Sequence, residues 1–190
     1  MVLLLRPLSL DVEDAALLAH LELAADGFEF LLDLQAGEPW ADYVARINGY
    51  ARGENLPDGY VPMTYLVAVV DGAVVGRTSI RHALSDFLLN VGGHIGYGVR
   101  PAHRRRGHAT EILCQSMAIT EALGIRENLV TCDDDNVGSA AVIERAGGVL
   151  EDVRNGKSRY WITRWGRLRV WAATLHRRLK RSAQGDNDLG

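Results

Sequence analysis

The hydrophobic pattern over the first quarter of the chain predicts one strand followed by two helices. Residues 2–8 form a short apolar run with the length of a buried edge strand. Apolar residues at helical spacing follow Asp11, which is expected to cap a helix that stops at Gly27. A second helix is predicted over residues 40–50. The apolar side of the first helix is expected to comprise Leu17, Leu18, Leu21 and Ala25.

Two β-hairpins are predicted from β-branched and aromatic runs that a turn dipeptide separates. Asp71-Gly72 separates the strands of the first pair, and Asn155-Gly156 those of the second. Both dipeptides suit two-residue turns in which both central residues take a positive φ. The predicted strands cover residues 64–70, 73–80, 149–153 and 158–163.

Between the hairpins, the pattern predicts a strand–helix–strand–helix series. Residues 93–99 read as a strand, 107–123 as a helix, 129–132 as a buried strand and 136–146 as a helix. Residues 84–89 are expected to form a loop or bulge. The resulting order, β-α-α-β-β-β-α-β-α-β-β, predicts an α/β fold whose mixed, mostly antiparallel sheet contains one crossover and is flanked by helices.

Composition and length indicate one soluble globular domain. The 190 residues contain no Pro/Gly/Ser-rich linker, and the apolar and charged fractions of 47% and 24% are ordinary for such a domain. The apolar run at the N-terminus is too short for a signal peptide or a membrane span. Cys114 and Cys132 are expected to be buried thiols, so a reducing, cytoplasmic location is predicted.

The last part of the chain is expected to differ from the domain at 1–163. Residues 164–181 carry seven Lys/Arg and no acid, with apolar residues at helical steps, which predicts a basic amphipathic helix. This helix could lie on an anionic surface, or pack on the domain or on a second subunit in a homodimer. Residues 182–190 are expected to be disordered. The net charge of −3 gives no reason to expect a specific nucleic-acid partner.

Three successive arginines, at positions 104–106, stand between the strand over 93–99 and the following helix. Cations at a helix N-terminus oppose the helix dipole unless an anion binds there, and the free amide groups of the first turn also attract phosphate. Gly107 allows the backbone to approach such an anion closely. The Rossmann and P-loop patterns are absent, so the segment predicts a different phosphate-binding loop.

The segment Arg104-Arg105-Arg106-Gly107-His108-Ala109, directly after a strand, resembles the coenzyme A loop of the GNAT superfamily, Gln/Arg-x-x-Gly-x-Gly/Ala. The resemblance covers about residues 60–163. It implies acetyl-CoA as cosubstrate, no metal, and transfer of the acetyl group to a primary amine of a small molecule or peptide. The coenzyme A-binding residues that it implies are Val99, Arg100, Arg104, Arg105, Arg106, Gly107, His108, Ala109, Thr110, Asn136 and Ser139.

Candidate catalytic residues lie on the strand before this loop. A bulge in the glycine-rich run 96–99 is expected to free the Val99 amide to bind the oxyanion. His94 is a candidate general base, because its reference pKa of about 6.5 is close to neutrality. The alternative is a structural histidine satisfied by a backbone group. The histidines show no metal-ligand spacing.

The leaving group presents a difficulty, because many relatives place a tyrosine seven residues after the helix-starting asparagine. Here that asparagine is Asn136, and Ile143 occupies the later position. Tyr97 or Tyr160 is expected to substitute as the acid. The missing tyrosine also leaves a second hypothesis open: a catalytically weak coenzyme A-binding sensor or adaptor with a basic recruiting tail. The acceptor is expected to contact residues 40–65 and 84–90.

Overall fold

The structure, a computed structural model, describes residues 2–163 and confirms the predicted fold class. One sheet holds seven strands in the order β1-β2-β3-β4-β5-β7-β6, and its neighbours are antiparallel except for the pair of β4 and β5. The helix predicted over 164–181 and the tail at 182–190 lie outside the described residues. The strands are β1 (Leu3–Pro7), β2 (Met63–Val70), β3 (Ala73–Arg81), β4 (Ile95–Val99), β5 (Glu127–Asp133), β6 (Gly148–Arg154) and β7 (Lys157–Thr163).

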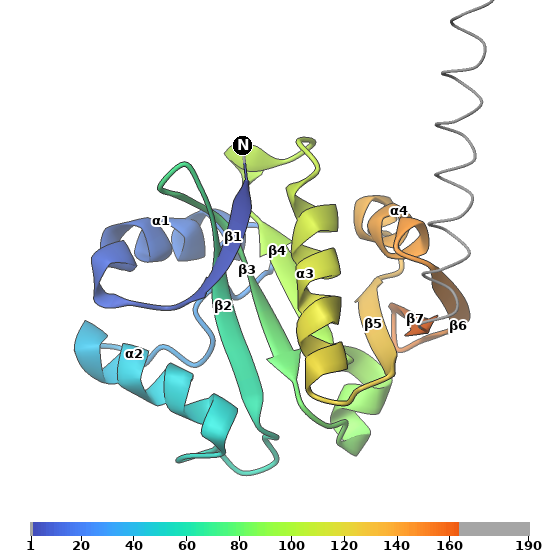
Figure 1. The fold of residues 1–190 in the computed structure, drawn as a ribbon, viewed down its shortest axis with the longest axis horizontal. Coiled ribbons are helices and arrows are strands. Elements are labelled where there is room, and N and C mark those ends of the chain that lie inside the picture. Colours follow the sequence, from blue (N-terminus) through green and yellow to red (C-terminus); the bar gives the residue numbers. More distant parts are fainter. Residues whose placement is uncertain (1, 164–190) are drawn as a thin grey trace, which may run out of the picture.

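Helices cover both faces of this sheet (Figure 1). Side chains of β2 alternate between the faces: Tyr65 and Val67 pack in one core with α1 and α2, while Ala68 packs in another with α3. Further along the sheet, α3 and α4 share a third core with β4, β5 and β7. The helices are α1 (Glu13–Ala24), α2 (Trp40–Gly49), α3 (His108–Ala122) and α4 (Val137–Arg145).

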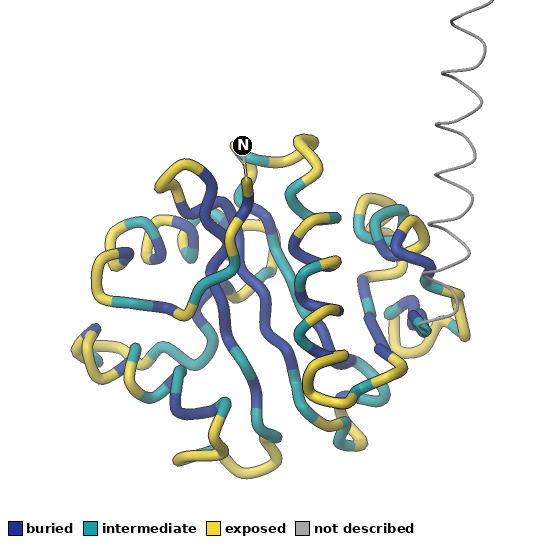
Figure 2. The backbone as a smooth tube through the Cα atoms, viewed as in Figure 1, coloured by how far each residue is buried: buried dark blue, intermediate teal, exposed yellow. Residues whose placement is uncertain are grey.

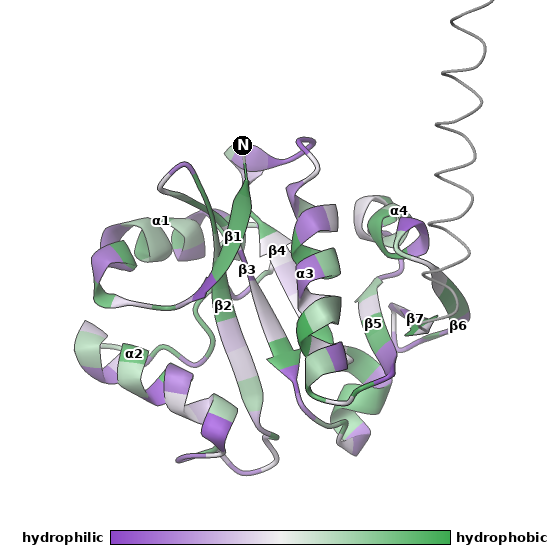
Figure 3. Ribbon diagram, in the orientation of Figure 1, coloured by the Kyte–Doolittle hydropathy of each residue, from purple (hydrophilic) through white to green (hydrophobic). Residues whose placement is uncertain are grey.

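The middle strands are the most buried part of the fold. Figure 2 shows β2 and β3 buried over most of their length, and Figure 3 shows the apolar residues that make up much of β1 and β2. Because both faces are covered, β2 carries a continuous apolar run over residues 65–70 instead of strict alternation. Among the helices that the structure describes, none has the length and apolarity that crossing a bilayer requires.

The turn dipeptides behave as predicted. Asp71 and Gly72 have φ values of 48° and 83°, and Asn155 and Gly156 have 52° and 70°. Positive φ at both central positions matches the right-handed twist of the flanking strands. Both hairpins are therefore confirmed, β2 with β3 and β6 with β7.

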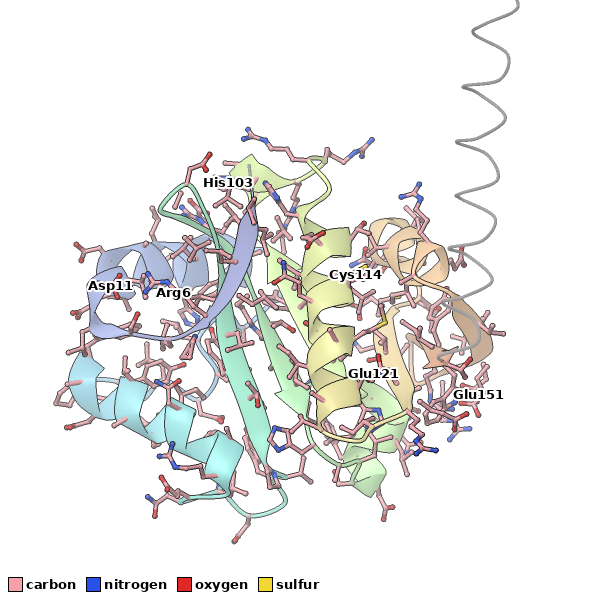
Figure 4. The ribbon with its side chains drawn as sticks, in the orientation of Figure 1. Arg6, Asp11, His103, Cys114, Glu121 and Glu151 are labelled. Atoms are coloured by element: carbon pink, nitrogen blue, oxygen red, sulfur yellow. The ribbon has the colours of Figure 1, made fainter. Side chains whose placement is uncertain are left out.

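The first helix differs from its prediction. Asp11 does not cap α1; its carboxylate binds Arg6 and Ser9 instead, with Arg6 Nη2 donating to Oδ2 at 2.8 Å (Figure 4). The predicted apolar side is also wrong, because Leu17, Leu18, Leu21 and Ala25 are exposed. The residues of α1 that are buried are Ala16, Ala19 and Leu23. Small alanines allow the helix to lie close to the sheet.

Two smaller expectations also need correction. The segment expected to be a loop or bulge at 84–89 enters helical structure, which continues as a π-helix over Leu88–Gly92. Cys114 is exposed on α3, where Figure 4 labels it, while Cys132 is buried as predicted. A helix that faces the sheet on one side exposes residues on the other, so an apolar neighbourhood in sequence did not fix the position of Cys114.

Gly76 is expected to be essential to the packing of β3 against β4. A Cβ atom at this position would lie 2.4 Å from the carbonyl oxygen of Gly98, which belongs to the neighbouring backbone and cannot rotate away. Gly76→Ala should lower the free energy of unfolding by about 1 to 3 kcal/mol in urea denaturation. Gly138→Ala is the matched control, because its Cβ would meet only Asn136 Oδ1 at 3.6 Å. An equal loss in both variants would contradict this explanation.

Candidate active site

Strands β4 and β5 pair at one position and then separate. Ile95 pairs with Val130, and the paired register of the two strands does not continue toward their C-terminal ends. A parallel ladder that stops after one position leaves the β5-facing edge of β4 without strand partners beyond Ile95. The N-termini of α3 and α4 follow these two strand ends, so the separation, both helix starts and the arginine loop share one end of the sheet (Figure 1).

The Val99 amide faces this separation, although the bulge predicted in β4 is absent. The register of β4 with β3 is continuous from Gly76 opposite Val99 to Ile80 opposite Ile95. The next amide, that of Arg100, donates to Val75 of β3 at 2.9 Å. Because N–H directions alternate along a strand, the Val99 N–H points to the opposite edge, toward β5. Strand separation, not a bulge, therefore aims this donor.

Tyr97 reaches across the separation to the start of α4. Its hydroxyl lies 2.9 Å from the Ser139 hydroxyl, and either oxygen can be the donor. Ser139 is itself fixed, because its backbone N–H donates to Asn136 Oδ1 at 2.9 Å in the α4 N-cap. Burial raises the pKa of Tyr97 to about 12. Its phenol therefore keeps its proton at neutral pH and can donate a hydrogen bond.

The other candidates for the acid position lie deeper. Ile143 is fully buried in the core beneath α4, as part of the same apolar cluster as Val130 and Ile162. Tyr160 is also buried, and its hydroxyl donates to Glu144 at 3.4 Å. Of the two tyrosines that the sequence singled out, Tyr97 is the one whose hydroxyl contacts Ser139, in the first turn of α4, at the strand separation.

His94 is held by the backbone of β5. The Nδ1 atom of its ring accepts a hydrogen bond from the backbone N–H of Leu129 at 3.0 Å. The backbone N–H of His94 donates to the Leu129 carbonyl at 2.7 Å. The ring is buried, and burial together with the charge of Arg81 lowers the pKa of His94 to about 4. In the neutral ring, the Nδ1 lone pair accepts this hydrogen bond, so the proton is on Nε2. These contacts support the structural alternative; a role as general base stays a prediction.

The three arginines of the loop at 104–106 differ in how they are held. Arg104 is fixed by Val99 O, to which its Nε donates at 3.1 Å, and by an ion pair with Asp26. Arg105 and Arg106 are exposed. Gly107, with φ 85°, is the N-cap of α3, and no side chain caps the helix.

The first amide groups of α3 are available to an anion. Within the helix, the first backbone bond runs from Glu111 N to Gly107 O, so the amides of His108, Ala109 and Thr110 precede the ladder. An added Cβ at Gly107 would meet no atom within 4 Å. This glycine is therefore required for its positive φ and for open access, not for close packing.

Arg100 connects the loop to α1. Its Nε and Nη2 each donate to the Glu22 carboxylate at 2.8 Å, and Nη1 donates to Val74 O at 2.9 Å. The hydrogen bonds from Arg100 lower the pKa of Glu22. All these contacts hold the strand end to α1, and the predicted contact of Arg100 with coenzyme A stays a prediction.

Two arginines that sequence reasoning missed lie beside the candidate site. Arg77 and Arg81 share one face of β3 with Ser79, on the side of α1 and α2. The ring of Phe28 lies over the Arg77 guanidinium, at 4.3 Å from its centroid. The sequence did contain a signal for them: charged residues lie on one face of a strand that is otherwise buried. Burying a charge costs free energy unless a partner or a ligand compensates it.

No metal centre is found in the part of the chain that the structure describes. Among residues 2–163, no three His, Cys, Asp or Glu side chains are placed to hold an ion.

Comparison with known proteins agrees with this geometry. A family model of the acetyltransferase (GNAT) domain matches residues 3–149, whereas no curated protein matches the chain. RimJ of Mycobacterium smegmatis, solved with CoA-disulfide, is 21% identical with a TM-score of 0.62, and the match covers 90% of this chain and 89% of that chain.

Two further solved structures share the fold at lower identity. The microcin C7 self-immunity acetyltransferase MccE, in complex with acetyl-CoA and AMP, is 16% identical with a TM-score of 0.59, covering 85% of this chain and 92% of that chain. The putative acetyltransferase yncA of Salmonella typhimurium, with acetyl-CoA, is 14% identical with a TM-score of 0.57, covering 85% and 93%. Because the family match spans most of its length, the chain belongs to the GNAT acetyltransferase family.

Proposed function

We propose that the protein transfers the acetyl group of acetyl-CoA to a primary amine by direct attack. The observation that carries this proposal is the Tyr97 hydroxyl, bonded to Ser139 where β4 and β5 separate. It provides a protonated acid beside the α3 N-terminus and the free edge of β4, where we place the thioester, although Ile143 occupies the position at which the family resemblance implies a tyrosine. The acceptor is a small molecule or the amine of a peptide.

Acetyl-CoA would lie with its pyrophosphate on the α3 N-terminus and its pantetheine arm in the strand separation. The amides of His108, Ala109 and Thr110 suit the phosphate oxygens, and the exposed Arg105 and Arg106 add attraction. Relatives with this fold were solved with acetyl-CoA, as in MccE, or with CoA-disulfide, as in RimJ. The free edge of β4 offers backbone groups to the amides of the pantetheine arm.

The reaction would proceed through a tetrahedral oxyanion. A neutral amine attacks the thioester carbonyl, and the Val99 N–H, which faces β5, donates to the oxygen as it gains charge. The nitrogen of this intermediate loses one proton to solvent, and the intermediate then collapses to the amide as its carbon–sulfur bond breaks. Tyr97, which Ser139 orients, donates its proton to the sulfur, so that coenzyme A leaves as the thiol. The phenolate of Tyr97 then recovers a proton from solvent.

The sensor hypothesis predicts a different outcome from the same site. A sensor needs the α3 N-terminus but has no use for a polar group at the thioester, and the buried Ile143 alone would favour it. The Tyr97–Ser139 contact favours the enzyme. Time-resolved release of free coenzyme A thiol, with acetyl-CoA and a panel of amines, separates the two. Saturable binding of acetyl-CoA without release for any amine would contradict the proposal.

Charge reversal in the loop should weaken cofactor binding. The double variant Arg105→Glu and Arg106→Glu should raise the Kd for acetyl-CoA at least about 10-fold at low salt, measured by calorimetry, because two exposed charges facing the phosphates change sign. The effect should shrink as salt screens it. Arg126→Glu is the control, an exposed arginine just beyond the opposite end of α3. Equal effects of the two changes would contradict phosphate binding at this loop.

A further inference from the structure

The guanidinium of Arg81 lies on the α1/α2 face of the sheet, directly over β4. If Gly96 carried a Cβ atom, that atom would lie 2.8 Å from Arg81 Nη1. Gly96 precedes Tyr97, whose side chain leaves the strand on the opposite face. Arg81 and the proposed acid therefore flank one stretch of β4 from its two sides.

The hydrogen-bonding capacity of this guanidinium is almost unused. Its single bond within residues 2–163 runs from Nη1 to Gly92 O at 3.5 Å, the outer limit for such a contact. An arginine carries five N–H donors in a planar fork that matches the two oxygens of a carboxylate. The side chain is partly exposed, so a ligand can reach the remaining donors.

The charge of Arg81 is also uncompensated. No Asp or Glu among the described residues forms an ion pair with Arg81 or Arg77. Burial and the like charge of Arg77 lower the pKa of Arg81 to about 10, so the group stays cationic at neutral pH. The other ionisable group that acts on it is Tyr60, whose pKa burial raises to about 12 and which is neutral at that pH.

Arg77 reinforces this positive field without being accessible itself. It is 3% exposed, and its guanidinium donates to Glu29 O at 2.6 Å and to Ser79 Oγ at 2.8 Å. Its Nε is buried without a partner in the described structure. The Glu29 carboxylate acts on Arg77 electrostatically, but neither arginine forms an ion pair within the described residues. Two neighbouring cations without an ion-pair partner oppose folding, and such a cost is typical of a binding site that a ligand completes.

We infer that the acceptor amine carries a carboxylate, which Arg81 binds bidentately while Arg77 supplies a fixed positive charge beneath it. The inference rests on the proposed function and narrows its acceptor to amino carboxylic acids. A carboxylate bound to Arg81, whose guanidinium itself covers Gly96, would hold the amine of the same small molecule near the stretch of β4 that ends at the Val99 amide. In this arrangement, the acceptor contact predicted for residues 40–65 would include Tyr60.

The test compares the twenty amino acids with their carboxamides, which keep the amine and the side chain but lack the charge. For the amino acid that is acetylated fastest, kcat/KM should exceed that of its carboxamide by about 100-fold, since buried donors would lose their partner. Arg81→Gln should remove this preference by raising KM for the acid. Arg126→Gln, at an exposed arginine in the connection between α3 and β5, is the control and should leave it unchanged.

Two measurements separate a ligand role from a structural one. Arg81→Gln should keep the Kd for acetyl-CoA and should not lower Tm, because it removes an uncompensated charge; a lower Tm would indicate a structural arginine and overturn the inference. Calorimetric binding of the same panel is measured in parallel, without turnover.

The outcomes distinguish this inference from the proposed function. Release of coenzyme A with uncharged amines, together with no turnover or binding of any carboxylate, overturns the inference and leaves the proposed function intact. Carboxylate binding that Arg81→Gln abolishes, without release for any amine, shows that Arg81 binds carboxylates but overturns the proposed function and, with it, the role of that carboxylate as part of an acceptor. If neither release of coenzyme A nor binding of a carboxylate is observed, both the proposed function and the inference are overturned.

Discussion

Tyr97→Phe is expected to lower kcat about 100-fold while the Kd for acetyl-CoA stays within about twofold. The variant removes one hydroxyl, the one that contacts Ser139, and loss of a general acid typically costs a factor of this size. The ring remains to fill the same space on β4, so folding should be preserved. Steady-state kinetics with the best acceptor, together with calorimetry for acetyl-CoA, measures both quantities.

Two further variants test whether position or residue type matters. Tyr160→Phe is the matched control, because that hydroxyl contacts Glu144 instead of the strand separation; kcat should change less than threefold or so. Ile143→Tyr should not restore activity to Tyr97→Phe, since Ile143 is fully buried and a larger side chain should destabilise the core by about 1 to 3 kcal/mol. Equal losses of kcat for both tyrosines would contradict the role of Tyr97.

His94 is expected to make the fold sensitive to acid between pH 6.5 and pH 4. The folded ring stays neutral down to about pH 4, whereas in the unfolded chain it takes up a proton near 6.5. Protons therefore bind preferentially to the unfolded state in this window, and the free energy of unfolding falls as the pH falls. At about 1.4 kcal/mol per pKa unit, this histidine should remove about 3 kcal/mol by pH 4.

His94→Gln isolates this effect from that of the carboxylates. Its amide oxygen can accept the Leu129 N–H without titrating, so the variant should lose less stability than the wild type between pH 6.5 and pH 4 in urea denaturation. Parallel pH curves for the two proteins would contradict the assigned contact. The same variant tests the predicted base, because retained kcat at pH 7 excludes that role and a 100-fold or larger loss supports it.

The elements could be predicted because their signals are local. Asp71-Gly72 and Asn155-Gly156 require positive φ values that few other residues accept, so they specify both hairpins from the sequence. The arginine loop likewise combined a strand end, a glycine and a helix start within ten residues. In the structure, Gly107 is the left-handed N-cap of α3.

Contacts between distant segments could not be predicted in the same way. The ion pair of Arg104 with Asp26, 78 positions away in the sequence, could not be predicted, and the expected contact of Arg104 with the phosphates stays a prediction. The partner of the Tyr97 hydroxyl, Ser139, became visible only when β4 and α4 were placed together. The uncompensated charge of Arg81 required knowledge of every acid around it, which depends on the whole fold.

The prediction of which face of α1 is buried was wrong for a related reason. Periodicity places Leu17, Leu18 and Leu21 on a helix, but it does not say which side meets the sheet when alanines occupy the other. Close approach of helix and sheet favoured Ala16 and Ala19 at the contact. Packing against the sheet, not hydrophobicity alone, selected the buried side.

The most direct measurement follows the acetyl carbon itself. Acetyl-CoA labelled with 13C at the carbonyl is mixed with the protein and an accepted amine, and the carbonyl resonance is recorded with time. Transfer to an amine predicts that the thioester signal is replaced by an amide signal, in an amount equal to the coenzyme A thiol released. Label that remains in the thioester, or that appears only as free acetate, would contradict the proposed N-acetyltransferase.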